Sequence, residues 1–130
     1  MVIDTSAIVA LLTNEPDEAA YREAIKATFD CRMSALNVYE CRVVLNAKGG
    51  EALAMAFDLL LAEAGIEIRP FDADQARLAY EAYRRFGKGS GHPAGLNLGD
   101  CAAYALARSL DAQLLYKGED FRQTDVATAV

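Results

Sequence analysis

The sequence predicts a single α/β domain in which a mainly parallel sheet is covered by helices on both faces. Short segments rich in apolar β-formers alternate along the chain with segments of helical periodicity, which is typical of this class. The length of 130 residues suits one domain. With 53% hydrophobic and 25% charged residues, the chain has the composition of a globular protein. We therefore treat residues 1–130 as one domain.

Four segments have the composition of short buried strands. They are Val2–Ile3 with its neighbours, Arg32–Ser34, Ile66–Arg69 and Gln113–Tyr116. Helical periodicity fills the intervals between them. The helical segments are Ala7–Leu12, Asp17–Thr28, Ala35–Ala47, Glu51–Ala64, Asp72–Phe86 and Leu98–Leu110. Because strands and helices alternate, we expect the strands to run parallel and to be joined by helical crossovers.

Residues with special backbone preferences mark the ends of these helices. Pro16 suits the first turn of the second helix, and Gly49–Gly50 is expected to break a long helical stretch in two. Asp72 followed by Gln75 is a capping-box pattern, in which each side chain accepts a hydrogen bond from the other residue's backbone N–H. The glycine-rich stretch Gly87–Gly95 is predicted to be a loop between two helices.

Composition argues against several classes of function. Cys31, Cys41 and Cys101 are an odd number with no Cys-x-x-Cys pair, so neither a disulfide framework nor a zinc site is expected. His92 is the only histidine, which disfavours a nucleophile activated by an imidazole base. No apolar run approaches the length of about 20 residues that a membrane span needs, and no signal-peptide pattern precedes the first strand. We therefore expect a cytoplasmic protein that does not associate with membranes.

The formal net charge of the chain is −6. A protein that holds nucleic acid in an extended basic groove carries the opposite sign. Either nucleic acid is not the ligand, or it is held at a local site where bound cations bridge carboxylates to phosphates. An acidic surface would also suit a basic protein partner.

Acidic residues from distant parts of the sequence are predicted to meet at one edge of the sheet. In a parallel sheet the carboxyl ends of the strands share one edge, where the following helices begin. Asp4 ends the first strand, and Glu40 lies in the second turn of the helix after the second strand. Asp100 is near the start of the last helix, and Glu119 and Asp120 follow the last strand. The sequence therefore predicts a cluster of carboxylates at this edge.

Each of these acids also has an ordinary structural interpretation. Asp4 can cap the helix that follows it, and Asn97 with Asp100 can form a capping box. Glu40 can be a solvated helix residue, and the last two acids can belong to a turn. Several carboxylates beside apolar neighbours are unfavourable unless cations offset their charge. Oxygen ligands without histidine or cysteine favour Mg²⁺ or Mn²⁺, which in turn suit a phosphate-containing substrate.

Four segments together resemble the PIN-domain ribonucleases, and most closely the VapC toxins of bacterial toxin–antitoxin pairs. They are MVIDTSA around Asp4, SALNVYE ending at Glu40, GKGSGHPAGLNLGDCAAYALA around Asp100, and LLYKGEDFRQTDV near the C-terminus. The resemblance implies a three-layer α/β/α domain over residues 1–130 with a sheet of four to five strands. It also implies Mg²⁺-dependent cleavage of RNA, a homodimer, and inhibition by a VapB-type antitoxin.

Carried over position by position, the resemblance also implies roles for individual residues. Asp4 and Asp100 correspond to the metal-binding acids of the family, and Glu40 corresponds to its third catalytic acid. Ser6 and Asn97 match polar positions that surround that site. All five residues lie in the segments that carry the resemblance.

The fourth acid is where this chain departs from the family pattern. Many relatives carry an acid at the position of Gly118. We assign the fourth catalytic acid to Asp120, with Glu119 as the alternative. Phe121 is expected to be buried and therefore to fix the direction of Asp120 more firmly than that of Glu119.

Two other functions stay open on the residues alone. A phosphatase could use Asp4 as its nucleophile, although such enzymes usually need a second acid two residues on, where Ser6 stands. A non-catalytic flavodoxin-like binding module could share the fold, but it has no need of converging acids. Lys88, His92 and Lys117 are candidates for contacts to an RNA backbone, and a solvated surface position is the alternative for each.

Overall fold

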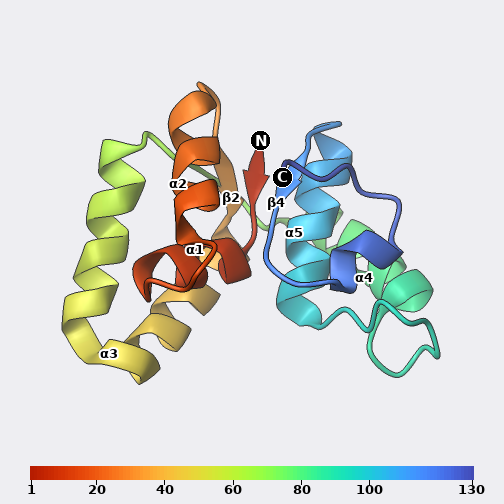
Figure 1. Cartoon of the computed structure of the whole chain (residues 1–130). Helices are drawn as coiled ribbons and strands as arrows, with labels where there is room; N and C mark the ends of the chain where they lie inside the picture. The colour runs from red at the N-terminus through yellow and green to blue at the C-terminus, as the bar shows by residue number, and fades with distance from the viewer.

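The computed structural model describes residues 1–130 and is built on a four-stranded parallel sheet (Figure 1). Its strands are β1 (Val2–Ile3), β2 (Arg32–Ser34), β3 (Glu67–Arg69) and β4 (Leu114–Leu115), in the spatial order β3-β2-β1-β4. Each strand lies within a segment predicted to be one, and every pairing is parallel. The predicted α/β class is therefore confirmed.

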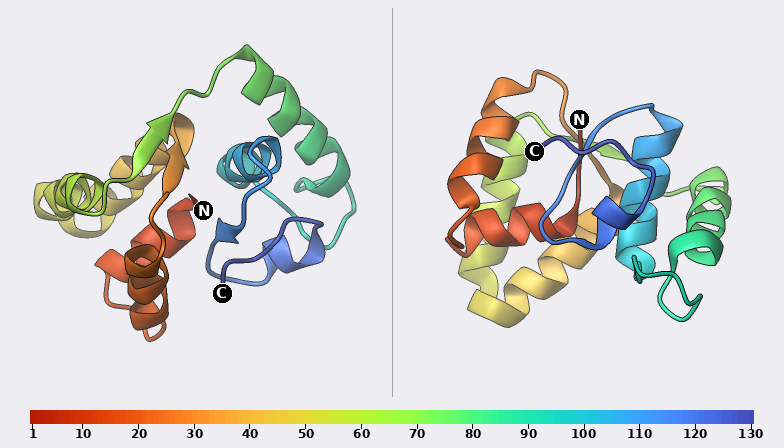
Figure 2. Two further views of the ribbon diagram at one scale, coloured as in Figure 1. Left: turned by 90° about the horizontal axis from the view of Figure 1, so that it is seen from above. Right: turned by 45° about the vertical axis from the view of Figure 1, so that its right-hand side comes forward.

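Helices cover both faces of this sheet. They are α1 (Thr5–Leu12), α2 (Glu18–Ala27), α3 (Ala35–Glu63), α4 (Ala73–Phe86) and α5 (Leu98–Ser109), followed by the 3₁₀ helix η1 (Asp120–Gln123). Figures 1 and 2 show α1, α2 and α3 on one side of the sheet and α4 and α5 on the other, which is the predicted three-layer arrangement. None of the helices combines the length and the apolar composition that crossing a membrane would require.

Two hydrophobic cores meet at the sheet, because successive side chains of a strand point to opposite faces. Val2 packs in the core that contains α4 and α5, whereas Ile3 packs in the core that contains α1, α2 and α3. In β4, Leu114 and Leu115 divide between the two cores in the same way. All four side chains are fully buried, and burying a side chain of this size stabilises a fold by about 1.5–3 kcal/mol. Strands of two residues can therefore hold the two layers together.

The C-terminal tail covers the outer edge of β4. Leu114 donates its backbone N–H to the Ala127 carbonyl (2.8 Å), and Ala129 donates its N–H to the Leu114 carbonyl (3.0 Å). Asp125 fixes the tail to α5 by accepting a hydrogen bond from the Tyr104 hydroxyl. An edge strand that is paired in this way is protected from pairing with another chain.

The first two helices begin at different residues from those predicted. α1 starts at Thr5 rather than Ala7, because the Asp4 side chain accepts a hydrogen bond from a backbone N–H of the first turn. α2 starts at Glu18, so Pro16 lies in the turn that precedes it and not in its first turn. Both differences are of the size at which helix ends commonly fray.

The capping box predicted for α4 forms only in part. Asp72 Oδ1 accepts a hydrogen bond from the Gln75 N–H (2.9 Å), as predicted. The Gln75 side chain, however, donates to the Ser109 hydroxyl of α5 (3.0 Å) and does not return to the Asp72 backbone. A contact between helices therefore replaces the second half of a local motif.

The break predicted at Gly49–Gly50 bends α3 sharply (Figure 1). Both glycines have non-helical backbone angles, and they separate residues 35–48 from residues 51–63. Gly50 has φ 69° and ψ −158°, a conformation in which a Cβ atom is strongly disfavoured. The bend lets Leu45 from the first part and Phe57 from the second be completely buried in the same core.

Replacing Gly50 with alanine should therefore destabilise the protein by about 1–3 kcal/mol, because the bend requires a backbone conformation nearly restricted to glycine. Urea denaturation of Gly50→Ala measures the loss. Glu51→Ala is the matched control, since Glu51 is exposed and helical and its replacement should change stability by less than about 0.5 kcal/mol. Equal stability of the two variants would mean that the bend does not depend on Gly50.

Candidate active site

A cavity of about 410 Å³ lies at the carboxyl edge of β1 and β4 and is lined mainly by polar side chains. We call it the acidic pocket. Its lining residues are Asp4, Thr5, Ser6, Val9, Glu15, Glu40, Val44, Asn97, Asp100 and Lys117. Three of the four predicted acids and both predicted supporting polar residues line this one cavity. Neither Asp120 nor Glu119 lines it.

Asp4 is held at the junction of β1 and α1 and is only 2% exposed. Its Oδ2 accepts two hydrogen bonds from Ser6, one from the backbone N–H (2.9 Å) and one from the hydroxyl (2.6 Å). Its Oδ1 is buried and has no hydrogen-bond partner. Burial, followed by the charge of Asp100, raises the pKa of Asp4 to about 7. The capping interpretation is therefore correct for one oxygen and leaves the other available for a cation.

Ser6 connects Asp4 to the exit of β4. While its hydroxyl donates to Asp4, its Oγ accepts a hydrogen bond from the backbone N–H of Lys117 (2.9 Å). Two segments more than one hundred residues apart in sequence are thus joined through a single hydroxyl. The predicted role of Ser6 as a polar residue beside the site agrees with this placement.

Glu40 reaches the acidic pocket from the second turn of α3. It accepts a hydrogen bond from the Thr5 hydroxyl and a long one (3.4 Å) from the Asn37 side chain. Asn37 is completely buried and also donates to the Gly99 carbonyl of α5 (3.0 Å). A Cβ atom at Gly99 would overlap the Glu40 carboxylate, so only glycine allows this close approach.

Sequence reasoning missed Thr5, Asn37 and Gly99. Asn37 precedes Glu40 by three residues, a spacing that places two side chains on the same face of a helix. That spacing is a usable signal for a partner of Glu40. The contacts with Thr5 and Gly99 cross between elements far apart in sequence, so no local pattern indicates them.

Asp100 forms the predicted capping box with Asn97 at the start of α5. Asp100 donates its N–H to Asn97 Oδ1 (2.8 Å), and its own Oδ2 accepts the Asn97 N–H (3.0 Å). Burial raises the pKa of Asp100 to about 6; the Asn97 hydrogen bond opposes this rise, and the charges of Glu40 and Asp120 add to it. Asp100 therefore both caps a helix and faces the other acids.

Asp120 and Glu119 differ in their surroundings. Asp120 is the first residue of η1, is exposed, and lies near enough to Asp100 for its charge to raise the pKa of that carboxyl. Glu119 forms an ion pair with Arg122 (3.6 Å). Phe121 is buried, as expected, and packs against the Tyr116 ring with centroids 4.9 Å apart. These placements favour Asp120 over Glu119 as the outer acid of the site.

The donor set of the acidic pocket suits a hard divalent cation such as Mg²⁺, because every ligand it offers is an oxygen. The unpartnered Oδ1 of Asp4 is the atom that fits this role most directly. As the side chains stand, no three acidic, imidazole or thiol groups are gathered closely enough to hold one ion. Glu40 and Asp100 are each held by hydrogen bonds of their own.

Only one of the three predicted cations is in place. Lys117 lines the acidic pocket, whereas Lys88 and His92 do not. His92 Nδ1 accepts a hydrogen bond from the Ala94 N–H (3.1 Å), and its ring packs edge-on against Phe86 with centroids 5.0 Å apart. His92 therefore supports the glycine-rich loop.

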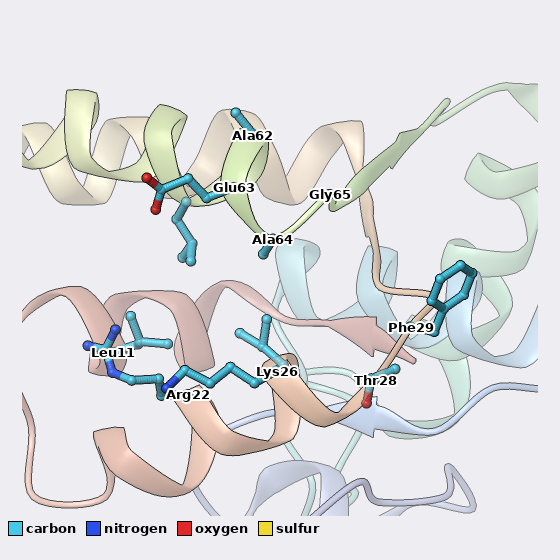
Figure 3. Close-up of a pocket in the computed structure, with 11 residues that line it drawn as sticks. Leu11, Arg22, Lys26, Thr28, Phe29, Ala62, Glu63, Ala64 and Gly65 are labelled. Carbon is cyan, nitrogen blue, oxygen red and sulfur yellow. The ribbon is translucent and has the colours of Figure 1, made fainter.

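A larger cavity of about 570 Å³ lies elsewhere, between α1, α2 and the end of α3 (Figure 3). Figure 3 shows Leu11 and the α2 side chains Arg22 and Lys26 facing the chain around Glu63. The two cations are paired on their own helix, with Glu18 and Glu23 respectively. This cavity shares no residue with the acidic pocket and gathers no cluster of acids, so the smaller pocket is the candidate active site.

Comparison with known proteins identifies the class to which this fold and site belong. The PIN domain family model matches residues 1–127. The chain therefore belongs to the PIN-domain family, and the family prediction is confirmed.

Its relatives by sequence are named VapC ribonucleases. The chain is 47% identical over 130 residues to ribonuclease VapC28 of Mycobacterium tuberculosis, covering 100% of this chain and 98% of the relative. It is 43% identical over 129 residues to ribonuclease VapC42 of the same species, covering 99% and 98%.

Solved structures share the fold at lower identity. The sarcin–ricin-loop-cleaving toxin VapC20 of Mycobacterium tuberculosis superimposes with a TM-score of 0.80 at 17% identity, covering 97% of this chain and 95% of that one. VapBC2 of Rickettsia felis, bound to a DNA fragment from its promoter, gives a TM-score of 0.71 at 16% identity, covering 98% and 94%. At these identities the likeness confirms the three-layer fold and nothing finer.

The burial of Asp4 predicts how stability depends on pH in the presence of EDTA. The folded protein keeps the Asp4 proton up to about pH 7, whereas the unfolded chain loses it near 3.8. Unfolding therefore releases this proton between these values, and stability should fall as the pH rises through that range. Asp100 acts in the same direction, with a pKa of about 6.

Asp4→Asn should flatten this decline and raise the thermal midpoint at neutral pH, since asparagine caps a helix as well as aspartate does. Thermal melts across the pH range measure the effect. Asp74→Asn, an exposed charge on α4, is the control and should follow the parent curve. A lower midpoint for Asp4→Asn at neutral pH would contradict this prediction. It would show that the ionised Asp4 carboxylate stabilises α1 as a cap by more than its burial and its repulsion from Asp100 destabilise the fold.

Proposed function

We propose that this chain is the toxin of a type II toxin–antitoxin pair and acts as an endoribonuclease that depends on Mg²⁺, with Mn²⁺ as the alternative ion. The observation that carries the proposal is the buried, unpartnered Oδ1 of Asp4 in a pocket that Glu40 and Asp100 also line. The names of the VapC relatives, at up to 47% identity over the whole chain, support an action on RNA.

Asp4 and Asp100 are the residues that would hold the cation, and Glu40 is the third acid. When bound, the cation would activate water and offset charge on the scissile phosphate. The chain itself orients the groups around it: Ser6 fixes Asp4, and Asn97 fixes Asp100. The N-terminus of α5 borders the pocket through Asn97 and Asp100, whose backbone N–H groups are both used in the capping box.

The alternative functions have weaker support. A phosphatase that used Asp4 as nucleophile would need a second acid at position 6, but the Ser6 hydroxyl there already donates to Asp4. A non-catalytic flavodoxin-like module would gain nothing from four acids in one pocket. The PIN-domain match over residues 1–127 supports the nuclease over both.

We also propose that the toxin is a cytoplasmic homodimer. A groove of about 570 Å³ on the α4–α5 side of the molecule is lined only by hydrophobic residues: Leu36, Phe71, Ala76, Ala79, Tyr80, Tyr83, Leu98 and Cys101. Tyr80 and Leu98 are 62% and 76% exposed in the single chain. Clusters of exposed large apolar side chains commonly mark protein interfaces, and a second copy is the occupant we propose.

The cleavage test compares three substitutions in one assay. Asp4→Asn should abolish Mg²⁺-dependent cleavage of a structured RNA while the protein stays folded, because it removes a direct ligand. Asp120→Asn should lower the initial rate about 10- to 100-fold. This is the usual loss when a residue that orients the metal ligands, without binding the metal itself, is replaced. Initial rates across a Mg²⁺ titration, with EDTA as the blank, measure all three.

Glu119→Gln is the matched control, since it removes a neighbouring charge that is already paired with Arg122. Its rate should stay near that of the parent. Full activity of Asp4→Asn would refute the proposed site, and a larger loss in Glu119→Gln than in Asp120→Asn would reverse the assignment of the fourth acid.

A VapB-type antitoxin is the protein partner we propose. A basic segment, with an arginine in the place of the cation, would complement the four carboxylates that line the pocket. The partner should co-purify with the toxin when the neighbouring reading frame is expressed with it. Asp100→Asn should weaken the complex, while Asp74→Asn on the outer face of α4 should not. Recovery of free toxin alone from the co-expression would contradict the pairing.

A further inference from the structure

Lys117 is the only cationic side chain that lines the acidic pocket. Four carboxylates line the same cavity, from Asp4, Glu15, Glu40 and Asp100. A phosphate group that entered would therefore meet one fixed positive charge of the protein. The position of that charge relative to the acids is set by two separate attachments.

The first attachment holds the ammonium group. Lys117 Nζ donates to Glu15 and to Asp17 Oδ1 (3.1 Å), and these hydrogen bonds raise the pKa of the lysine. Glu15 is itself fixed by the end of α1, where Asn14 adopts φ 55° and the Glu15 N–H donates to the Ala10 carbonyl (3.0 Å). This is a Schellman-type ending, in which a left-handed residue closes the helix.

The second attachment holds the backbone. The Lys117 N–H donates to Ser6 Oγ (2.9 Å), and the Ser6 hydroxyl donates to Asp4 (2.6 Å). The lysine is thereby connected through one hydroxyl to the carboxylate that offers an unpartnered oxygen. Its charge and that oxygen are positioned by the same small network.

The ammonium group keeps capacity for another acceptor. It carries three N–H donors, two of which are used by Glu15 and Asp17. The side chain is 35% exposed and faces the cavity. A cation that is already ordered loses little conformational freedom when it binds an anion.

From this arrangement we infer that Lys117 binds a phosphate of the RNA beside the bond to be cleaved, and that Glu15 and Asp17 hold it in place for that contact. Lysine is a common phosphate ligand and acts there as a point charge. The inference rests on the proposed ribonuclease function and assigns it a substrate-binding residue. The competing interpretation is that Lys117 is a structural latch. In that case its ion pairs only join the α1–α2 turn to the segment after β4, and the lysine does not contact the substrate.

Salt dependence separates the two interpretations. Each phosphate contact with a single strand contributes about 0.7 to the slope of log affinity against log salt. Lys117→Met should therefore make this negative slope shallower by about 0.7. It should also raise KM for a single-stranded RNA oligonucleotide, with a smaller change in kcat. Lys117→Arg keeps the charge and should keep the slope.

Two further variants sharpen the test. Lys26→Met on α2 is the control for the loss of one lysine charge: it breaks one ion pair, where Lys117→Met breaks two, and it lies in the other cavity. It should leave KM and the slope unchanged. Glu15→Gln removes a negative charge from the pocket while Asp17 still holds the lysine, so KM should fall. A latch would instead make Glu15→Gln lose kcat as Lys117→Met does.

The inference is overturned if wild-type protein cleaves the RNA and Lys117→Met keeps its KM and its salt slope. It is also overturned if only kcat falls, because that result identifies a latch. Circular dichroism and thermal midpoints of each variant identify any loss of folding, and Lys117→Arg then provides the measurement on a folded protein. Failure of the ribonuclease function itself has a different signature, since the wild-type protein would then cleave no RNA with Mg²⁺ or Mn²⁺.

Discussion

The buried carboxylate of Asp4 is the constraint on which the rest of the site depends. β1 delivers this side chain into the interior, where it is 2% exposed, and an ionised group without partners is strongly unfavourable there. Ser6 satisfies one oxygen. The other oxygen requires a proton or a cation, and the cores on both faces of β1 offset this local destabilisation.

Helix capping in this pocket leaves carboxylate oxygens free for a cation. Asp4 caps α1 with Oδ2 and leaves Oδ1 free, while Asp100 completes a capping box and still faces the other acids. Both acids cap because helices begin at the carboxyl edge of a parallel sheet. The same geometry places both carboxylates on one pocket. The hydrogen bonds of each carboxylate limit the repulsion among them when no cation is bound.

Particular residues show how far the sequence alone could predict this arrangement. Strands β1 and β4 could be predicted because they are buried on both faces and are therefore wholly apolar. Asp4 and Asp100 could be placed because strand and helix ends share one edge. The contact between Asn37 and Gly99 could not, because it is a hydrogen bond between residues 62 positions apart. The tight contact between Gly99 and Glu40 is likewise a product of helix packing.

Charge explains how one acidic pocket could serve two kinds of partner under the proposed function. RNA brings negative charge to a cavity with four carboxylates and one lysine, so it needs the cation as well as Lys117. A basic antitoxin segment brings its own positive charge and needs neither. The substrate would therefore bind together with the metal, and the antitoxin in place of it. A protein of net charge −6 can then act on RNA without a basic groove, because the bound cation and Lys117 offset the negative charge of the RNA within a single pocket.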